Sequence, residues 1–408
     1  MSGRTPPQAQ EKLNFFELAS IPTVSLSLPL VLVGDVLAKK YGAASAILSI
    51  LIGNLILWII AIAIISMAQK THLNAIENIK GYLGHFGTAI VALVLILAFM
   101  NWYALQINTS LTTLDHFFDF HTSWSKDIYL RLGASLGVLS ALFATGGIRL
   151  FKNITVICLP LFICFYLYEI IKADYSIIFT EKWRPSFGAV LSTILLLLPG
   201  FINFPTIFQH SRSRAHSYLG LTLSILLISI FEISTIWIKL SNPHLWTGFQ
   251  LVLITIYILM TLACSNLLNI FFASACWQTI VPKFGGAKGY AIIGLLGTLT
   301  YTFLQISSPV LFFERLTNCY MASLGAVLLM AHLMRITLQH RPRPFEKTLN
   351  LAAWIFGCVV ATIYESRGPS ENFESLLSGV GASVLFFMSV VFIEETTWAI
   401  KTKLRIKA

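Results

Sequence analysis

The sequence predicts an all-α integral membrane protein, because its composition and its hydrophobic pattern both indicate that fold class. Of the 408 residues, 56% are hydrophobic and only 11% are charged, whereas about 25% of the residues of a soluble domain are charged. The apolar stretches are long continuous runs, as membrane-spanning helices require, and do not alternate like the strands of a transmembrane β-barrel. This composition excludes an ordinary soluble enzyme.

Twelve apolar runs are long enough to cross a bilayer as helices, which needs about 20 residues each. We expect these transmembrane helices near residues 17–38, 43–67, 87–110, 128–146, 148–171, 186–209, 217–239, 247–276, 287–306, 309–334, 349–364 and 376–398. An even number of spans places both termini on the same side of the membrane.

The net charge of +10 comes from Lys and Arg in short loops between the apolar runs. Such loops set membrane topology, so the charge does not indicate a nucleic-acid partner. Basic residues are more frequent on the side that holds the termini, above all in 210–216 and 335–347. The positive-inside rule therefore predicts a multi-pass protein of the cell (inner or plasma) membrane with both termini in the cytoplasm.

Prolines interrupt the first and the sixth span in a similar way. Pro22 and Pro29 flank small polar residues in the first, and Pro199 and Pro205 flank glycine and asparagine in the sixth. Proline removes a backbone donor, and unwound backbone is tolerated inside a membrane only where it is buried or lines a cavity. Interrupted helices at corresponding places indicate a transporter built from inverted repeats. The alternative is that these prolines only kink ordinary helices.

The repeat interpretation gives a five-plus-five core with two appended helices. We expect a cytoplasmic N-terminal tail at 1–16, a first repeat at 17–171, a second, inverted repeat at 186–334, accessory helices at 349–398 and a cytoplasmic C-terminal tail at 399–408.

Polar residues inside the third and the eighth span are candidates for a binding site. Trp102 and Gln106 lie four residues apart and so share a helix face, where an indole could stack on a flat heterocycle and a carboxamide could bond its edge. Ser265, Asn266 and Asn269 lie on the counterpart span of the second repeat. The alternatives are an interfacial tryptophan and polar residues that bond neighbouring helices.

Glu232 lies within the apolar seventh span, with no basic residue near it in the sequence. A carboxylate at this depth is costly and is usually functional, so Glu232 is a candidate proton relay. The alternative is a neutral glutamate bonded to a nearby serine or to the backbone.

Several short motifs resemble those of the nucleobase:cation symporter family. Residues 50–57 (ILIGNLIL), followed by 68–73 (AQKTHL), resemble its second span and the loop after it. Residues 101–103 (NWY), 200–203 (GFIN) and 269–274 (NIFFAS) fall where the cytosine permease branch has Gly-Trp-Phe, Ser-Phe-Ile-Ser and Asn-Ala-Leu-Tyr-Ala-Ser. The chain thus resembles the cytosine, purine and hydantoin permeases, and the cytosine permeases most.

The resemblance implies the sodium-symporter architecture that amino-acid transporters share, with alternating access to a small planar base. By position, Trp102 would stack on the base and Phe201 would close its opposite face, while Gln106 and Asn269 would bond its polar edge. Asn203 stands where the cytosine branch has serine.

One position departs from the cytosine branch. Gln106 matches the hydantoin branch, which has a glutamine one turn after the tryptophan. The cytosine branch has its glutamine three residues before the tryptophan, where this chain has Phe99. The exact base is therefore open.

The resemblance also implies a sodium ion between the break in the first span and the eighth span. Candidate ligands are backbone carbonyls from Ser25 to Leu28 and the side chains of Ser265 and Asn266. The family has a pair of hydroxyls on the eighth span, of which this chain has one. The resemblance favours sodium, and Glu232 offers a proton route instead. We expect no cofactor and no other metal.

Three functions compete. The first is a secondary active transporter that imports a cytosine-like nucleobase or a related heterocycle, coupled to Na⁺ or H⁺. The second keeps the fold but carries an amino acid or another small polar solute. The third is a polytopic membrane enzyme, for which only the segment 115–121 offers clustered His and Asp. The aromatic pair favours the first, so the expected partners are a small-molecule substrate and the lipid bilayer.

Overall fold

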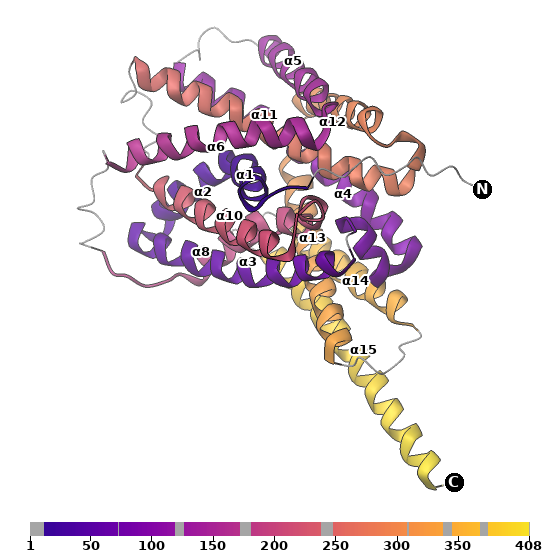
Figure 1. Cartoon of the computed structure of the whole chain (residues 1–408). Helices are drawn as coiled ribbons and strands as arrows, with labels where there is room; N and C mark the ends of the chain where they lie inside the picture. Colours follow the sequence, from indigo (N-terminus) through magenta and orange to yellow (C-terminus); the bar gives the residue numbers. More distant parts are fainter. Residues whose placement is uncertain are drawn as a thin grey trace.

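A computed structural model describes residues 12–71, 73–118, 126–171, 181–237, 248–307, 310–337, 345–367 and 374–407. The described residues form a bundle of α-helices (Figure 1). The first half of the chain contains α1 (Phe15–Ser25), α2 (Ser27–Tyr41), α3 (Ala43–Thr71), α4 (Ala75–Phe118), α5 (Lys126–Ala144) and α6 (Gly147–Ile171).

The second half contains α8 (Phe187–Ile202), α9 (Pro205–Phe208), α10 (Arg214–Ser234), α11 (Phe249–Ile280), the 3₁₀-helix η3 (Pro282–Phe284), α12 (Ala287–Ser307), α13 (Val310–Thr337), α14 (Glu346–Ser366) and α15 (Glu374–Lys407). The helices α13, α14 and α15 pack against one another. The end of α15 projects beyond the rest of the bundle (Figure 1).

The prediction of an all-helical membrane protein is confirmed. Among the described residues, nine helices are long and apolar enough to cross a membrane: α3, α4, α5, α6, α10, α11, α13, α14 and α15. The first and sixth predicted spans fall outside that group because each is divided into two shorter helices. The ninth predicted span corresponds to α12, which is also outside that group. This helix carries glycine, threonine and tyrosine among its apolar residues. The number of twelve spans stays a prediction.

Both predicted helix breaks are present. The pair α1 and α2 is interrupted at Leu26, and the pair α8 and α9 at Asn203 and Phe204. The first pair packs against α3, α6, α10 and α11, and α8 packs against α3 and α13. The breaks are therefore enclosed by other helices, as unwound backbone in a membrane requires.

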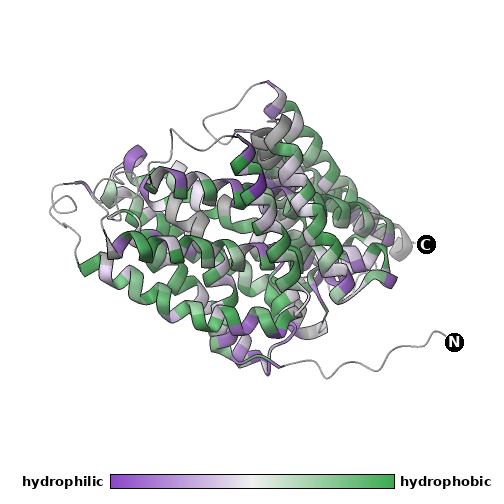
Figure 2. Ribbon diagram, turned by 90° about the horizontal axis from the view of Figure 1, so that it is seen from above, coloured by the Kyte–Doolittle hydropathy of each residue, from purple (hydrophilic) through white to green (hydrophobic). Residues whose placement is uncertain are grey.

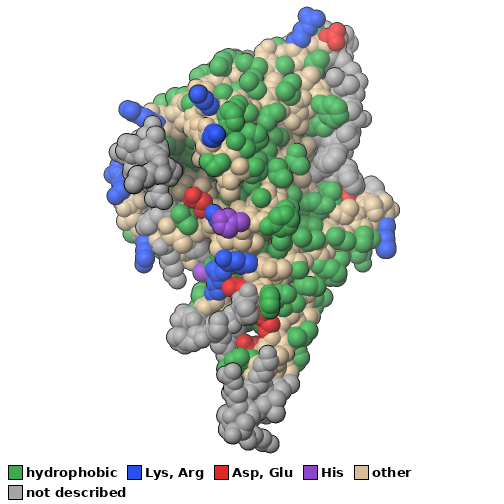
Figure 3. All heavy atoms as spheres, turned by 90° about the vertical axis from the view of Figure 1, so that its right-hand side faces the viewer, with side chains coloured by type: hydrophobic (Ala, Val, Ile, Leu, Met, Phe, Trp, Pro, Cys, Tyr) green, Lys and Arg blue, Asp and Glu red, His purple; other side chains and the backbone are tan. Residues whose placement is uncertain are grey.

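Apolar side chains face outward over much of the bundle. Leu97, Leu385 and Phe392 are each more than 60% exposed, which suits contact with lipid tails. Hydrophobic residues follow most helices along their length (Figure 2). They also cover a broad area of the face in Figure 3, where Lys and Arg gather along the left side and at the top.

A glycine lets α2 approach α10 closely. A Cβ atom on Gly34 would lie 2.0 Å from the backbone oxygen of Glu232 and 2.0 Å from Oγ1 of Thr235. Real Cβ atoms do not approach so closely, so only glycine allows this helix contact. Gly381 of α15 is the opposite case, since nothing lies within 4 Å of its Cβ position.

We expect Gly34→Ala to destabilise the protein, because overpacking a close helix contact costs about 1–3 kcal/mol. The matched control is Gly381→Ala, which makes the same chemical change in a helix with open space around it. Thermal unfolding of the purified variants in detergent tests the pair. Equal melting temperatures for the two variants would contradict the close approach of α2 and α10.

Candidate functional site

A cavity lies beside the break between α1 and α2. Residues of α1, α4, α8, α11 and α13 line it. Its lining combines aromatic, polar and small aliphatic groups: Ser25, Leu26, Ala98, Phe99, Trp102, Gln106, Leu197, Gly200, Ser265, Leu268, Asn269, Phe272 and Met321. Both repeats of the predicted architecture contribute to this lining, as a central transport site requires.

Two carboxamides form the polar wall of the cavity. Nδ2 of Asn269 on α11 donates a hydrogen bond to Oε1 of Gln106 on α4, at 3.1 Å. Both side chains are only 6% exposed. After this bond the pair still offers the amide N–H donors of Gln106 and the Oδ1 acceptor of Asn269. The pair can therefore bind a ligand edge that carries one acceptor and one donor.

Aromatic side chains form the neighbouring wall. Trp102 lies one helical turn before Gln106 on α4, and Phe99 lies three residues before Trp102. The ring of Phe99 packs against that of Phe272 on α11, with 5.4 Å between the ring centroids. A flat ring next to the carboxamides would thus meet aromatic surface.

The break between α1 and α2 is stabilised from α11. Pro29 has no N–H, so the carbonyl of Ser25, four residues earlier, lacks its usual helical donor. The hydroxyl of Ser265 donates to this carbonyl, which satisfies a group that would otherwise be unpaired. The hydroxyl of Ser25 itself is buried and has no hydrogen-bond partner.

A third predicted ion ligand, the Asn266 side chain, is directed to another helix. Asn266 turns toward α5, where its Nδ2 donates to Oγ of Ser140 at 3.4 Å, and its Oδ1 is buried without a partner. Leu28 lies in α2, and its side chain is outside the described residues. The structure thus brings Ser25 and Ser265 together and directs the Asn266 side chain to α5, while the Leu28 carbonyl stays a predicted ligand.

Phe201 and Asn203 lie at the break between α8 and α9, outside the lining of the cavity. Phe201 is fully buried and packs on Phe204, with 4.4 Å between ring centroids. The backbone N–H of Asn203 donates to the carbonyl of Gly200 at 3.0 Å. Of the described side chains and backbone around this break, Gly200 lines the cavity.

Sequence reasoning missed Phe99, Phe272 and Met321 as lining residues. Two of them had a readable signal, because Phe99 and Trp102, like Asn269 and Phe272, are three residues apart and share a helix face. Met321 lies on α13 and had none, since its position depends on how that helix packs.

Glu232 is buried between helices and does not line the cavity. Its Oε2 accepts a hydrogen bond from Nδ2 of Asn54 on α3. The partner is thus an asparagine on another helix, neither a nearby serine nor the backbone.

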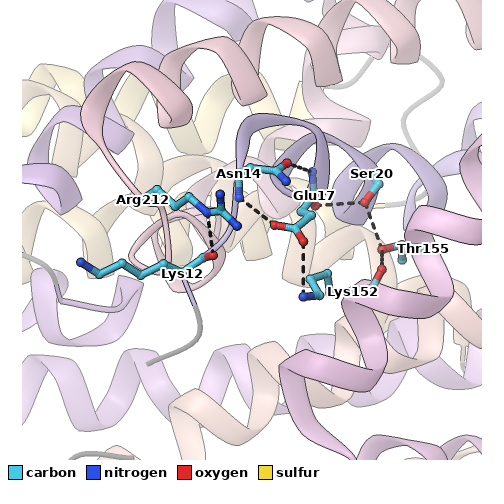
Figure 4. Close-up of polar contacts among 7 residues, drawn as sticks. All are labelled: Lys12, Asn14, Glu17, Ser20, Lys152, Thr155 and Arg212. Carbon is cyan, nitrogen blue, oxygen red and sulfur yellow. Dashed lines mark hydrogen bonds and ion pairs between the residues drawn. The ribbon is translucent and has the colours of Figure 1, made fainter. Parts of the chain in front are cut away.

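Polar contacts fix the start of α1 (Figure 4). Glu17 and Asn14 cap the helix reciprocally, and Oε1 of Glu17 lies 3.3 Å from Nζ of Lys152 on α6. Oγ of Ser20 lies 3.2 Å from Oγ1 of Thr155. These contacts hold the half of the broken helix that ends at Ser25 against α6.

The described residues contain no group of three or more His, Cys, Asp or Glu that could hold a metal ion. Of the segment 115–121, Asp115 accepts a hydrogen bond from the hydroxyl of Tyr129. Residues 119–121 lie outside the described residues.

Several solved structures of transporters share this fold. The chain is similar over 98% of its length to 96% of MHP1, described as a nucleobase-cation-symport-1 family transporter in a closed conformation with bromovinylhydantoin bound (TM-score 0.68, 13% identity). It is similar over 92% of its length to 89% of a Na⁺-coupled sialic acid symporter in a substrate-bound outward-open state (TM-score 0.67, 13% identity).

A manganese transporter from Eremococcus coleocola matches less well, with a TM-score of 0.54 and 14% identity over 96% of this chain and 95% of that one. No protein-family model and no curated protein sequence matches the chain. The comparisons confirm the fold that the resemblance to nucleobase:cation symporters implied, and they do not favour its cytosine branch.

We expect Ser265→Ala to lower stability, because it leaves the buried carbonyl of Ser25 without a donor, at a cost of about 1–3 kcal/mol. Ser274→Ala is the matched control on the same helix, since the Ser274 hydroxyl is buried and has no hydrogen-bond partner. In thermal unfolding, the melting temperature should fall for Ser265→Ala and should change little for Ser274→Ala. Two equal curves would contradict the bond between α1 and α11.

Proposed function

We propose that this protein is a secondary active transporter that imports a nucleobase or a related small planar heterocycle by alternating access. The observation that carries the proposal is the Gln106–Asn269 carboxamide pair beside Trp102, in a cavity at a broken membrane helix. The shared fold with MHP1, which was solved with a hydantoin derivative bound, supports it.

The chemistry of the cavity favours a ring with an amide edge. The carboxamide pair presents N–H donors from Gln106 and an acceptor from Asn269, which complement the C=O and N–H of a cyclic amide. Trp102, Phe99 and Phe272 suit the face of such a ring. None of the described residues that line the cavity is charged, which disfavours a zwitterionic amino acid, the alternative substrate.

The shared fold and the motifs support the proposal that the chain is a member of the nucleobase:cation symporter family. In this assignment the repeats comprise 17–171 and 186–334, and the helices of 349–398 are accessory. Both termini lie in the cytoplasm of a cell whose inner or plasma membrane holds the protein, as the excess of Lys and Arg on their side suggests.

Sodium is the coupling ion that the resemblance implies, and its candidate ligands are only partly suited to it. A hard cation needs a shell of oxygen ligands. The hydroxyl of Ser265 is already bonded to the Ser25 carbonyl, and Asn266 is directed to Ser140. Two oxygens of the candidate ligands are buried without a hydrogen-bond partner, the Ser25 hydroxyl and Oδ1 of Asn266.

A ligand screen tests the proposed function. The purified protein would be melted with nucleobases, hydantoins and amino acids, each with and without Na⁺. A ligand that binds only the folded state raises the melting temperature by mass action. We expect stabilisation by uracil, cytosine or hydantoin, and stabilisation by amino acids alone would reject the proposal.

We expect Trp102→Ala to weaken binding of the ring compound while the protein still folds. Stacking of an aromatic side chain on a base is worth roughly 1–3 kcal/mol, which corresponds to about tenfold to a hundredfold in affinity. The control is Trp398→Ala, in an exposed position on α15. Unchanged affinity of the Trp102 variant in a direct binding assay would remove this residue from the site.

We expect Asn269→Leu to weaken binding more than Asn269→Asp. The leucine variant leaves Gln106 and the substrate edge without their partner, at about 1–3 kcal/mol, whereas aspartate keeps an acceptor oxygen. Calorimetric titration of both variants gives the two affinities. If both variants bind the ligand like the wild type, Asn269 is not part of the binding site.

A further inference from the structure

The buried pair Glu232 and Asn54 lies outside the cavity and has an incomplete set of hydrogen bonds. Glu232 is 0% and Asn54 1% exposed. One bond joins them, from Nδ2 of Asn54 to Oε2 of Glu232. The other two oxygens of the same groups, Oε1 of Glu232 and Oδ1 of Asn54, are buried without a partner.

No ion pair of Glu232 is present among the described residues, and the hydrogen-bond partner of its carboxyl group is the neutral Asn54. A buried carboxylate without a counter-charge costs free energy in a medium of low dielectric constant. The charged form of Glu232 is therefore poorly accommodated in this conformation.

The helices around the pair contribute few titratable groups. From α6, Tyr166 lies near Glu232. Its ring stacks on Phe231 with 4.2 Å between centroids, and its hydroxyl lies 2.7 Å from that of Tyr257 on α11. From α2, Asp35 follows the contact residue Gly34 and pairs with Lys39 at 2.7 Å. The described parts of α3 and α8 add no titratable side chain near the pair.

A proton on Glu232 would provide the hydrogen bond that both the carboxyl group and the Asn54 amide lack. A protonated carboxyl group has one O–H donor, which at Oε1 can donate to Oδ1 of Asn54. With the existing bond from Nδ2, acid and amide then form a closed pair with two hydrogen bonds. The two unpartnered oxygens are the two that this single proton would join, whereas the ionised carboxylate leaves both acceptors without a donor.

The position of the pair connects it to the cavity. Gly34 of α2 touches the backbone of Glu232, and Gly53, next to Asn54, packs on Thr193 of α8. Leu26, at the start of α2, and Gly200, near the end of α8, line the cavity. A change in the Glu232–Asn54 pair therefore acts on α2 and α8, which adjoin the first and the second helix break.

We propose that Glu232 and Asn54 form a proton-binding site that couples substrate transport to a proton gradient. The proton comes from hydronium on the outer side, forms an O–H bond at Glu232, and returns to water in the cytoplasm, so that each cycle leaves the protein unchanged. This inference rests on the proposed function, because it assigns the coupling ion of that transporter.

Glu232→Gln tests the site, because its amide reproduces both hydrogen bonds of the protonated acid and cannot release a proton. The probe is radiolabelled uracil, cytosine or hydantoin, whichever the melting screen identifies, in proteoliposomes. The matched control is Glu365→Gln, which neutralises a second buried carboxylate on the accessory helix α14.

In the wild type and the Glu365 variant, an inward proton gradient without Na⁺ should accumulate the probe several-fold. The Glu232 variant should bind and exchange the probe at equal concentrations but lose the accumulation. Accumulation by the Glu232 variant at the wild-type level would overturn the site. So would wild-type uptake that responds only to Na⁺ and is abolished by Ser265→Ala. Absence of any ligand binding by the wild type would instead reject the proposed function.

Infrared difference spectroscopy gives a readout that does not depend on transport. The wild type should show the carbonyl band of a protonated carboxylic acid, and Glu232→Gln should lack it, while Glu365→Gln should keep it. A spectrum of the Glu232 variant that retains the full wild-type band would also overturn the proposal.

Discussion

The requirement that backbone groups inside a membrane be hydrogen-bonded governs this structure. Pro29 deprives the carbonyl of Ser25 of its helical donor, and Ser265 supplies one from α11. This bond links the break in the first helix to the helix that carries Asn269. The cavity forms at that junction, where the unwound turn leaves room and the neighbouring helices α4 and α11 provide polar and aromatic side chains.

Much of this arrangement could be predicted from the sequence, because helical periodicity and proline chemistry are local. The prolines indicated both breaks, and the spacing of Trp102 and Gln106 indicated a shared face. That Gln106 would lie beside Asn269 could be predicted only from the resemblance to a family. The positions of Phe201 and Asn266 could not be predicted, because they depend on packing: Phe201 turns to Phe204, and Asn266 turns to α5.

The pairing of Glu232 with Asn54 shows the same limit. Glu232 stood out as a charged residue in an apolar span, but its partner lies 178 residues away in the chain. From the sequence, Asn54 was recognised only as part of the segment 50–57, which resembles the second span of the nucleobase:cation symporter family. The tertiary contact gives that motif a physical role, since one asparagine both donates to the carboxyl group and can accept from it.

In the proposed function, the cavity binds both the edge and the face of a planar heterocycle. The most direct measurement is an experimental structure of the protein with bound uracil, cytosine or hydantoin. We expect a ring stacked on Trp102, with its amide edge within hydrogen-bonding distance of Gln106 and Asn269. A ligand bound elsewhere, or one whose polar edge points away from this carboxamide pair, would contradict it.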